Sequence, residues 1–155
     1  MFVIKDGDLL NATETYICHQ CNCVSTGSAA GLARVIFDRL PYADIYKDRD
    51  GKDGPGTIVV AKGTKSIINI LGQFYPGGIS YEYSELDGRE ARKRYFKLAL
   101  WEMAKTLPGS SFAFPWRVGC GIAGGDWGEY IGILKSFESY IDGDVAIYRL
   151  PGDKS

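Results

Sequence analysis

Apolar residues recur along the chain in two patterns, one typical of strands and the other of helices. Short apolar runs bounded by turn-prone residues predict strands at 2–5, 15–20, 57–61, 66–71, 111–115 and 145–150. Helical spacing predicts three helices, one beginning at Leu32, one over 89–107 and one that carries Tyr130, Ile133, Leu134, Phe137 and Ile141. Because strands and helices alternate, the pattern favours a largely parallel sheet that is covered by helices on both faces.

The segments between these elements carry turn and cap signals. Pro41 ends the first predicted helix, and Asp87 is a candidate cap for the longest helix, whose Arg and Lys side chains lie opposite its apolar face. The charged stretch 46–56 is predicted to be a solvated connection. We expect 62–65 to form a tight turn between two strands and Pro76 to open a long loop.

Length and composition fit one folded unit. The chain has 155 residues, of which 45% are hydrophobic and 24% charged, enough for one domain at 1–150 with a continuous core. Residues 151–155 are predicted to be a frayed tail. The formal net charge of -1 argues against a main role in binding long nucleic acids, which calls for a basic surface, although it allows a local basic patch.

The sequence gives no sign of a membrane segment or of disulfides. No apolar run reaches membrane-spanning length and the first residues lack the layout of a secretory signal, so we expect a cytoplasmic or nuclear protein. Cys18, Cys21 and Cys23 lie close together and Cys120 far away, a spacing that matches neither a disulfide framework nor two zinc knuckles. We therefore expect reduced thiols.

Two glycine-rich segments, 26–31 and 119–125, each lie between a predicted strand and a predicted helix. A helix N-terminus presents unpaired N–H groups and the positive end of its dipole, and glycine lets the backbone approach an anion closely. Both segments fall at the carboxyl ends of strands, where parallel sheets bind their ligands. Two such loops in one small domain predict a site for a diphosphate.

The spacing of Gly119, Gly121 and Gly124 also matches the fingerprint of a dinucleotide-binding Rossmann domain. That fingerprint normally opens its fold and is followed by further strand and helix units. Only one helix and one strand follow it here. We therefore favour the two-loop diphosphate site.

His19 is the only histidine, and it shares one side of its predicted strand with Ile17 and Cys21. It is a candidate general acid or base near neutral pH. The alternative, which we prefer slightly, is a histidine that is hydrogen-bonded within the sheet and orients the loop. Metal binding by His19 with the cysteines needs an unusual strand geometry and is a minor alternative.

Cys120 and Asp126 each allow a chemical and a structural interpretation. A thiolate at Cys120 would be stabilised by the helix that follows, as in a cysteine hydrolase, but a small residue between two glycines is the simpler reason for it. Asp126 fits an N-terminal cap, and its carboxylate could instead activate water or accept a proton from a ribose hydroxyl. Two roles stay open for four aromatic residues, packing within the protein or stacking on a base: Trp127, Tyr75, Tyr81 and Tyr83.

Several segments together resemble the macro domain family. They are Gly7-Asp8-Leu9, 19–23, Gly31-Leu32-Ala33, Asn69-Ile70-Leu71 and 115–127, and the resemblance runs from Gly7 to Leu150. The second glycine segment is most similar to the branch of ADP-ribose-1''-phosphate phosphatases and terminal ADP-ribose protein glycohydrolases. The resemblance implies a three-layer α/β/α domain with a mixed, mostly parallel central sheet, which binds ADP-ribose with the diphosphate between the two glycine segments.

The resemblance also implies roles for individual residues. Asn22 would contact the distal ribose, Ile17 and Tyr148 would border the adenine, and Asp126 or His19 would serve hydrolysis. The other ligand-binding residues that it implies are Gly27, Gly31, Leu32, Gly119, Cys120, Gly121, Ile122, Ala123, Gly124 and Gly125.

The chain departs from the family pattern in three places. Thr15, with Glu14 beside it, stands where many macro domains place an aspartate against the adenine amino group. Residues 66–87 contain no lysine, and Gln73 occupies the region where the glycohydrolase branch uses one, which closes a covalent lysine route. Residues 22–33 contain no acid, so the aspartate route of a further subgroup is unsupported.

We therefore favour an ADP-ribose-binding domain that hydrolyses ADP-ribose-1''-phosphate or a related ADP-ribose derivative. Two alternatives stay open. One is a non-catalytic reader of free or protein-linked ADP-ribose, and the other is a hydrolase that removes ADP-ribose from protein or nucleic acid. The expected partners are ADP-ribose, ADP-ribose-1''-phosphate and ADP-ribosylated macromolecules, without a membrane. Nothing in the sequence requires a metal or a cofactor, and we expect a monomer.

Overall fold

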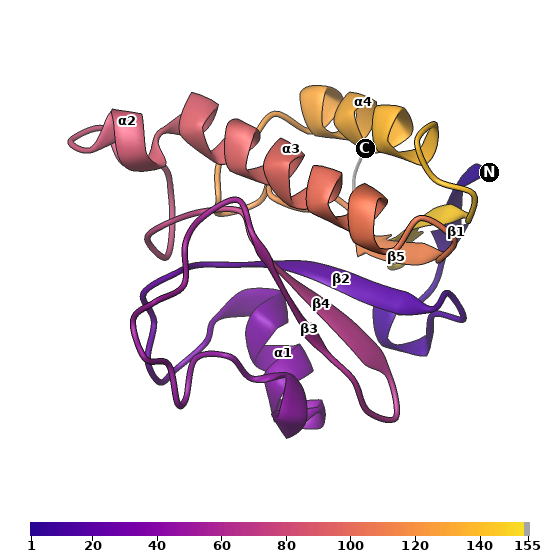
Figure 1. The fold of residues 1–155 in the computed structure, drawn as a ribbon, viewed down its shortest axis with the longest axis horizontal. Coiled ribbons are helices and arrows are strands. Elements are labelled where there is room, and N and C mark those ends of the chain that lie inside the picture. Colours follow the sequence, from indigo (N-terminus) through magenta and orange to yellow (C-terminus); the bar gives the residue numbers. More distant parts are fainter. Residues whose placement is uncertain (154–155) are drawn as a thin grey trace.

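A six-stranded sheet organises residues 1–153, which are the residues that the computed structural model describes (Figure 1). The strands are β1 (Phe2–Asp6), β2 (Tyr16–Cys21), β3 (Ile58–Ala61), β4 (Ser66–Leu71), β5 (Phe112–Pro115) and β6 (Val145–Arg149). Their order is β1-β6-β5-β2-β4-β3, with every neighbouring pair parallel except β3 and β4. The prediction of a mixed, mostly parallel sheet is confirmed.

Helices cover both faces of the sheet. The α-helices are α1 (Gly31–Arg39), α2 (Ser84–Asp87), α3 (Arg89–Thr106) and α4 (Trp127–Glu138), and short 3-10 turns occupy Leu9–Asn11 and Pro41–Ala43. In Figure 1, α3 and α4 lie above the sheet and α1 lies below it. The three layers expected from the alternation of strands and helices are therefore present.

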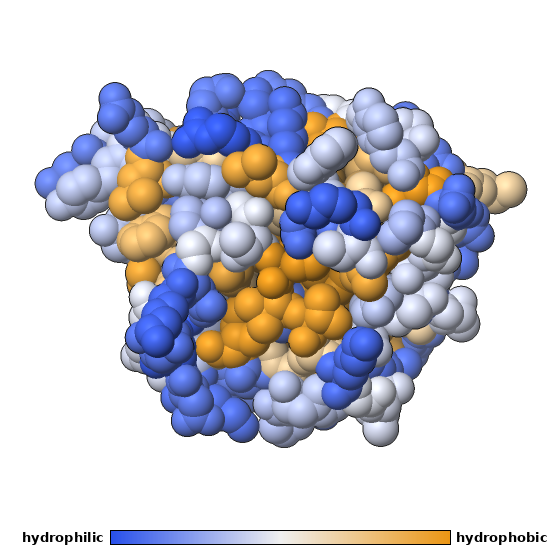
Figure 2. Space-filling model, viewed as in Figure 1, coloured by the Kyte–Doolittle hydropathy of each residue, from blue (hydrophilic) through white to orange (hydrophobic). Residues whose placement is uncertain are grey.

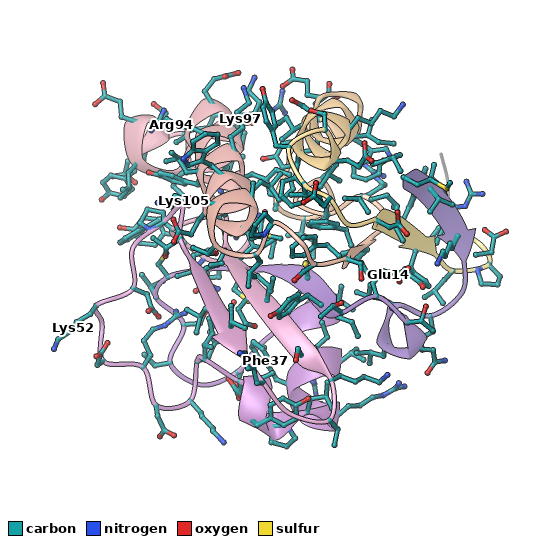
Figure 3. The ribbon with its side chains drawn as sticks, turned by 45° about the vertical axis from the view of Figure 1, so that its right-hand side comes forward. Glu14, Phe37, Lys52, Arg94, Lys97 and Lys105 are labelled. Atoms are coloured by element: carbon teal, nitrogen blue, oxygen red, sulfur yellow. The ribbon has the colours of Figure 1, made fainter. Side chains whose placement is uncertain are left out.

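The central strand β2 contributes to both halves of the core because successive side chains of a strand point to opposite faces. Ile17 and Cys21 pack in the cluster on the α1 side, which includes Phe37, and Cys18 packs in the cluster under α3 and α4. Figure 3 labels Phe37 on α1, where its ring meets that of His19 edge to face at 5.4 Å. The predicted division of β2 into two sides is confirmed.

Several expectations about the connections are wrong. Asp87 does not cap α3, because Gly88 is the cap residue and the Asp87 carboxylate accepts hydrogen bonds from the amides of Phe74 and Tyr75 instead. The stretch 46–56 is not a solvated connection throughout, since Tyr46 is buried and the Arg49 side chain is 1% exposed. The last helix ends at Glu138, before Ile141, and the short helix α2 interrupts the predicted long loop.

The β3 edge of the sheet carries exposed apolar side chains. Val60 of β3 is partly exposed, and Leu98 and Trp101 of α3 are 48% and 61% exposed. Figure 2, in the same view as Figure 1, shows hydrophobic surface below α3, where β3 and β4 lie.

None of the helices within residues 1–153 has the length and the apolar character that a membrane crossing requires.

Candidate functional site

A cleft of about 350 Å³ lies at the carboxyl ends of β2, β4 and β5. Both glycine segments line it, the first through Ser28 to Gly31 and the second through Gly119, Gly121, Ile122 and Ala123, and Leu32 and Ala33 of α1 line it beside the first. The loops thus meet at one site, as the diphosphate hypothesis requires. A larger hollow of about 610 Å³ lies between α3 and α4, and neither loop contributes to it.

Backbone amides supply the donors of this cleft. Within residues 1–153, no hydrogen bond is made by the N–H groups of Gly31, Leu32 and Ala33, which form the first turn of α1. The same holds for the N–H groups of Gly121, Ile122 and Ala123 in the second loop. All six residues line the cleft. Unpaired amides at a helix N-terminus and in a glycine loop are the groups that bind phosphate oxygens.

The second loop needs its glycines because it lies against Tyr130 of α4. Gly119 has a φ of 73°, and a Cβ on it would lie 2.6 Å from Tyr130 Cε2. A Cβ on Gly125 would lie 2.8 Å from Tyr130 Cε1, and its amide donates to the Gly119 carbonyl at 3.0 Å. Gly121 differs, because a Cβ there would meet no atom within 4 Å. Gly119 and Gly125 thus allow the loop to pack closely against Tyr130, and Gly121 leaves open space at the cleft.

Asn22 shapes the first loop with its own side chain. Its Oδ1 accepts hydrogen bonds from the amides of Val24 at 3.0 Å and Ser25 at 2.8 Å, and its Nδ2 donates to Ser25 Oγ at 3.0 Å. This is an Asx turn, in which the side chain replaces a backbone partner. Asn22 also lines the cleft, so the residue predicted to contact the distal ribose first organises the loop.

The buried side chain of Arg49 binds backbone carbonyls of the same loop. Its guanidinium donates to the carbonyl of Asn22 at 2.8 Å and to that of Ser25 at 3.1 Å, and it pairs with Asp53 at 2.9 Å. The guanidinium also lies over the ring of Tyr46, 4.7 Å from its centroid. Arg49 and Tyr46 are residues that the sequence analysis missed, because they fall in a stretch that looked solvated.

A second buried arginine fixes the other wall of the cleft. Arg92 of α3 pairs with Asp87 and donates to the carbonyl of Ala123 in the second loop at 3.0 Å. It also donates to the carbonyls of the 75–78 segment, at 3.2 Å to Tyr75, 2.8 Å to Gly77 and 2.9 Å to Gly78. Arg92 therefore joins two segments that line the cleft. The expectation that the Arg and Lys side chains of this helix lie opposite its apolar face is wrong for Arg92.

His19 lies on the cleft wall but is engaged inside the sheet. Its Nε2 lies 2.6 Å from Asn69 Oδ1, and Asn69 Nδ2 donates to the carbonyls of Ala43 and Val59. Those two carbonyls fix the orientation of the amide, so His19 carries its proton on Nε2. Burial lowers the pKa of His19 to about 4, so the ring is neutral at pH 7. This geometry favours the orienting role, and the catalytic role stays a prediction.

The side chains of Gln20 and Gln73 are hydrogen-bonded to each other in the lining of the cleft. Gln73 Nε2 donates to the carbonyls of Tyr75 and Gly77, and Gln73 Oε1 accepts from Gln20 Nε2 at 2.7 Å. Gln20 Oε1 then remains without a partner among the described residues, although it is buried beside Gly119. One buried acceptor beside the second loop is therefore left without a partner among residues 1–153.

The cysteines near the cleft are thiols rather than thiolates. All four cysteines are free and buried. Burial raises the pKa of Cys23 to about 12 and that of Cys120 to about 12, and it raises the pKa of Cys21 further. These directions disfavour a cysteine nucleophile at Cys120. Within residues 1–153, no group of three or more His, Cys, Asp or Glu side chains could hold a metal ion.

Some predicted site residues lie outside the lining of the cleft. Asp126 is exposed and caps α4, its Oδ1 accepting from the Glu129 amide at 3.2 Å. Ile17 is buried near the amino end of β2, and Tyr148 donates from its hydroxyl to Glu14, which Figure 3 labels. Gly27, Cys120, Gly124 and Gly125 belong to the loops without lining the cleft. Ligand contacts by these residues stay predictions.

The rim of the cleft carries aromatic and cationic groups. Trp116 lies on the wall, and its ring meets Trp127 at 5.1 Å in an edge contact. Arg149 at the end of β6 stacks over Trp116, 5.0 Å from the ring centroid. Arg117, the next residue, also lines the cleft. The two tryptophans, which flank the second glycine loop in the sequence, therefore contact each other in the fold.

The chain has the macrodomain fold, in which the cleft described above lies between two glycine loops. The macrodomain of Thermus aquaticus DarG is similar at 20% identity, with a TM-score of 0.72 over 96% of this chain and 98% of that one. The macrodomain of Mycobacterium tuberculosis DarG is similar at 22% identity, with a TM-score of 0.68 over 96% of this chain and 97% of that one. Thermosipho africanus DarTG, solved in complex with ADP-ribose, is similar at 16% identity, with a TM-score of 0.75 over 96% of this chain and 41% of that one. No protein-family model and no curated protein matches the sequence.

Proposed function

We propose that this chain binds ADP-ribose, free or attached to a macromolecule, as a non-catalytic reader. The proposal depends on one observation, the meeting of both glycine loops at a single cleft that presents six unpaired backbone amides. Such amides donate hydrogen bonds to phosphate oxygens, and their partial positive charge complements the negative charge of a diphosphate. The ADP-ribose complex of Thermosipho africanus DarTG, which shares the fold, supports this choice of ligand.

The side chains that line the cleft favour non-catalytic binding of ADP-ribose over its hydrolysis. Among the described residues, no Asp, Glu or Lys lines it, and its ionisable side chains are His19, Cys21, Tyr46 and Arg117. Burial keeps His19 neutral by lowering its pKa and raises the pKa of Cys21 and Tyr46. General acid–base catalysis needs a group whose pKa lies near the working pH. None of the three buried groups meets that condition.

Polar groups beside the loops extend the site toward a ribose. Asn22 and Gln20 line the same part of the cleft, at the end of β2. Both side chains carry amide groups, which can donate hydrogen bonds to a ribose hydroxyl and accept them from it. We assign the distal ribose of ADP-ribose to this end of the cleft.

The test is calorimetric titration of the purified protein with ADP-ribose, followed by chromatography of the mixture after long incubation. We expect saturable binding, with a Kd on the order of micromolar, and recovery of intact ADP-ribose. Ribose 5-phosphate is the matched control ligand, because it offers a ribose and a phosphate without the diphosphate. Absence of heat at millimolar ADP-ribose would show that the proposal is wrong.

Hydrolysis of ADP-ribose-1''-phosphate is the second candidate function. Asp126 favours it, because the residue directly follows the second loop and its Oδ2 accepts no hydrogen bond within residues 1–153. A free carboxylate oxygen there could accept a proton from water if the loop brought it to the terminal phosphate. Phosphate release from that compound by the wild-type protein would select this candidate over the reader.

A further inference from the structure

Arg117 has an unusual backbone at the rim of the cleft. Its φ of 61° makes it the only residue other than glycine with a positive φ among residues 1–153. Side chains with a Cβ avoid this left-handed region, and such outliers are common at binding and catalytic sites. Asparagine and glycine adopt the region readily, whereas arginine gains nothing from it by itself.

The charge of Arg117 is also unbalanced. No carboxylate lies within 4.0 Å of its guanidinium in the described part of the chain, and Nη2 donates to the Cys120 carbonyl at 3.2 Å. The two other arginines that support the cleft walls, Arg49 and Arg92, are each paired with an aspartate. A guanidinium has five N–H donors, so most of those of Arg117 remain available.

These two features coincide at a cleft that suits an anion. Arg117 lines the cleft beside the unpaired amides of the second loop, and no carboxylate on the lining opposes its charge within residues 1–153. A cation at the mouth of a site lined by amide donors attracts anionic ligands and adds a charge-assisted hydrogen bond.

We propose that Arg117 is a specificity-determining residue that binds a phosphate oxygen of the ligand's diphosphate from the rim of the cleft. Arg117, with its left-handed backbone, lines the cleft where the second loop begins. This inference rests on the proposed binding of ADP-ribose. It makes the affinity depend on the charge of the ligand and on ionic strength, which amide donors alone would do more weakly.

Arg117→Asn separates binding from folding, because asparagine removes the charge and tolerates the left-handed backbone. We expect its Tm to stay equal to that of the wild type or to rise, while ADP-ribose binds at least tenfold more weakly. The salt dependence of the Kd should fall in the same variant. Arg117→Gly should repeat the loss of affinity, and Arg117→Lys should restore part of it, since an ammonium keeps the charge without the planar fork.

Arg94→Gln is the matched control, because Arg94 is exposed on α3 and does not line the cleft (Figure 3). We expect it to leave the Kd and its salt dependence unchanged. If the wild type binds ADP-ribose and Arg117→Asn and Arg117→Gly bind it within twofold with the same salt dependence, the role of Arg117 is refuted and the reader function stands. If the wild type does not bind, both the function and this inference fail.

Discussion

Arg92 Nη2 lies 2.7 Å from Asp87 Oδ2, in an ion pair whose side chains are 2% and 0% exposed. The guanidinium also holds four backbone carbonyls from two segments that support the cleft. Removing one member of a buried pair leaves the other charge without compensation, which costs about 3–5 kcal/mol. The pair therefore contributes to the stability of the domain as well as to the shape of the site.

Arg92→Met should lower the free energy of unfolding by that amount, measured by urea denaturation. Arg94→Met, on an exposed position of the same helix, is the control and should change it by less than about 0.5 kcal/mol. Equal stabilities for the two variants would mean that the Arg92 network is dispensable.

The buried His19 makes stability depend on pH. Its folded-state pKa of about 4 lies below the ordinary value of 6.5, so the unfolded chain binds a proton first as the pH falls. The stabilisation is complete above pH 6.5 and is lost progressively down to about pH 4, by about 3 kcal/mol. We expect urea denaturation of the wild type to show this loss in excess of that of His19→Gln. Parallel curves for the two proteins would contradict a buried neutral imidazole.

Two glycines of the second loop should respond differently to substitution by alanine. At Gly119 a Cβ would lie 2.6 Å from Tyr130 on a backbone with a φ of 73°, so Gly119→Ala should destabilise the fold by about 2–3 kcal/mol. At Gly121 a Cβ meets no protein atom within 4 Å, so Gly121→Ala should leave the Tm unchanged. The added methyl group stands at the cleft, and we expect ADP-ribose to bind about tenfold more weakly. A Gly121→Ala variant that binds normally would place the ligand elsewhere.

Asp126 distinguishes the reader from the phosphatase. Asp126→Ala should cost about 1 kcal/mol because the cap of α4 is lost, whereas Asp126→Asn should keep the cap. For a reader, both variants should bind ADP-ribose within twofold of the wild type in calorimetry. Phosphate release from ADP-ribose-1''-phosphate by the wild type, abolished in Asp126→Asn, would instead assign a chemical role to this carboxylate.

The fold was predictable because its signals are local. Periodicity located every strand and the three long helices to within a few residues, and the glycine segments indicated where the loops meet. The strand 66–71 was predicted with its observed bounds, since its buried apolar run has turn residues on both sides. These features depend on spacing along the chain, which a sequence displays directly.

The arginine contacts that support the site were not predictable in the same way. Arg49 and Arg92 bind backbone carbonyls, which have no signature in a sequence, so they resembled solvated charges. One signal was present, because Arg92 lies four positions before Phe96 and so on the apolar face of α3. Arg117 offered no such signal, since its backbone conformation and its lack of an ion pair exist only in the folded chain.

The pairing of β1 with β6 has a consequence for the order of folding. β1 is an edge strand whose one neighbour in the sheet is β6, with Phe2 aligned to Val145. Parallel pairing across such a separation slows folding, because the loop entropy is lost before the contact is gained. β1 therefore joins the sheet late, after β6 has formed beside β5.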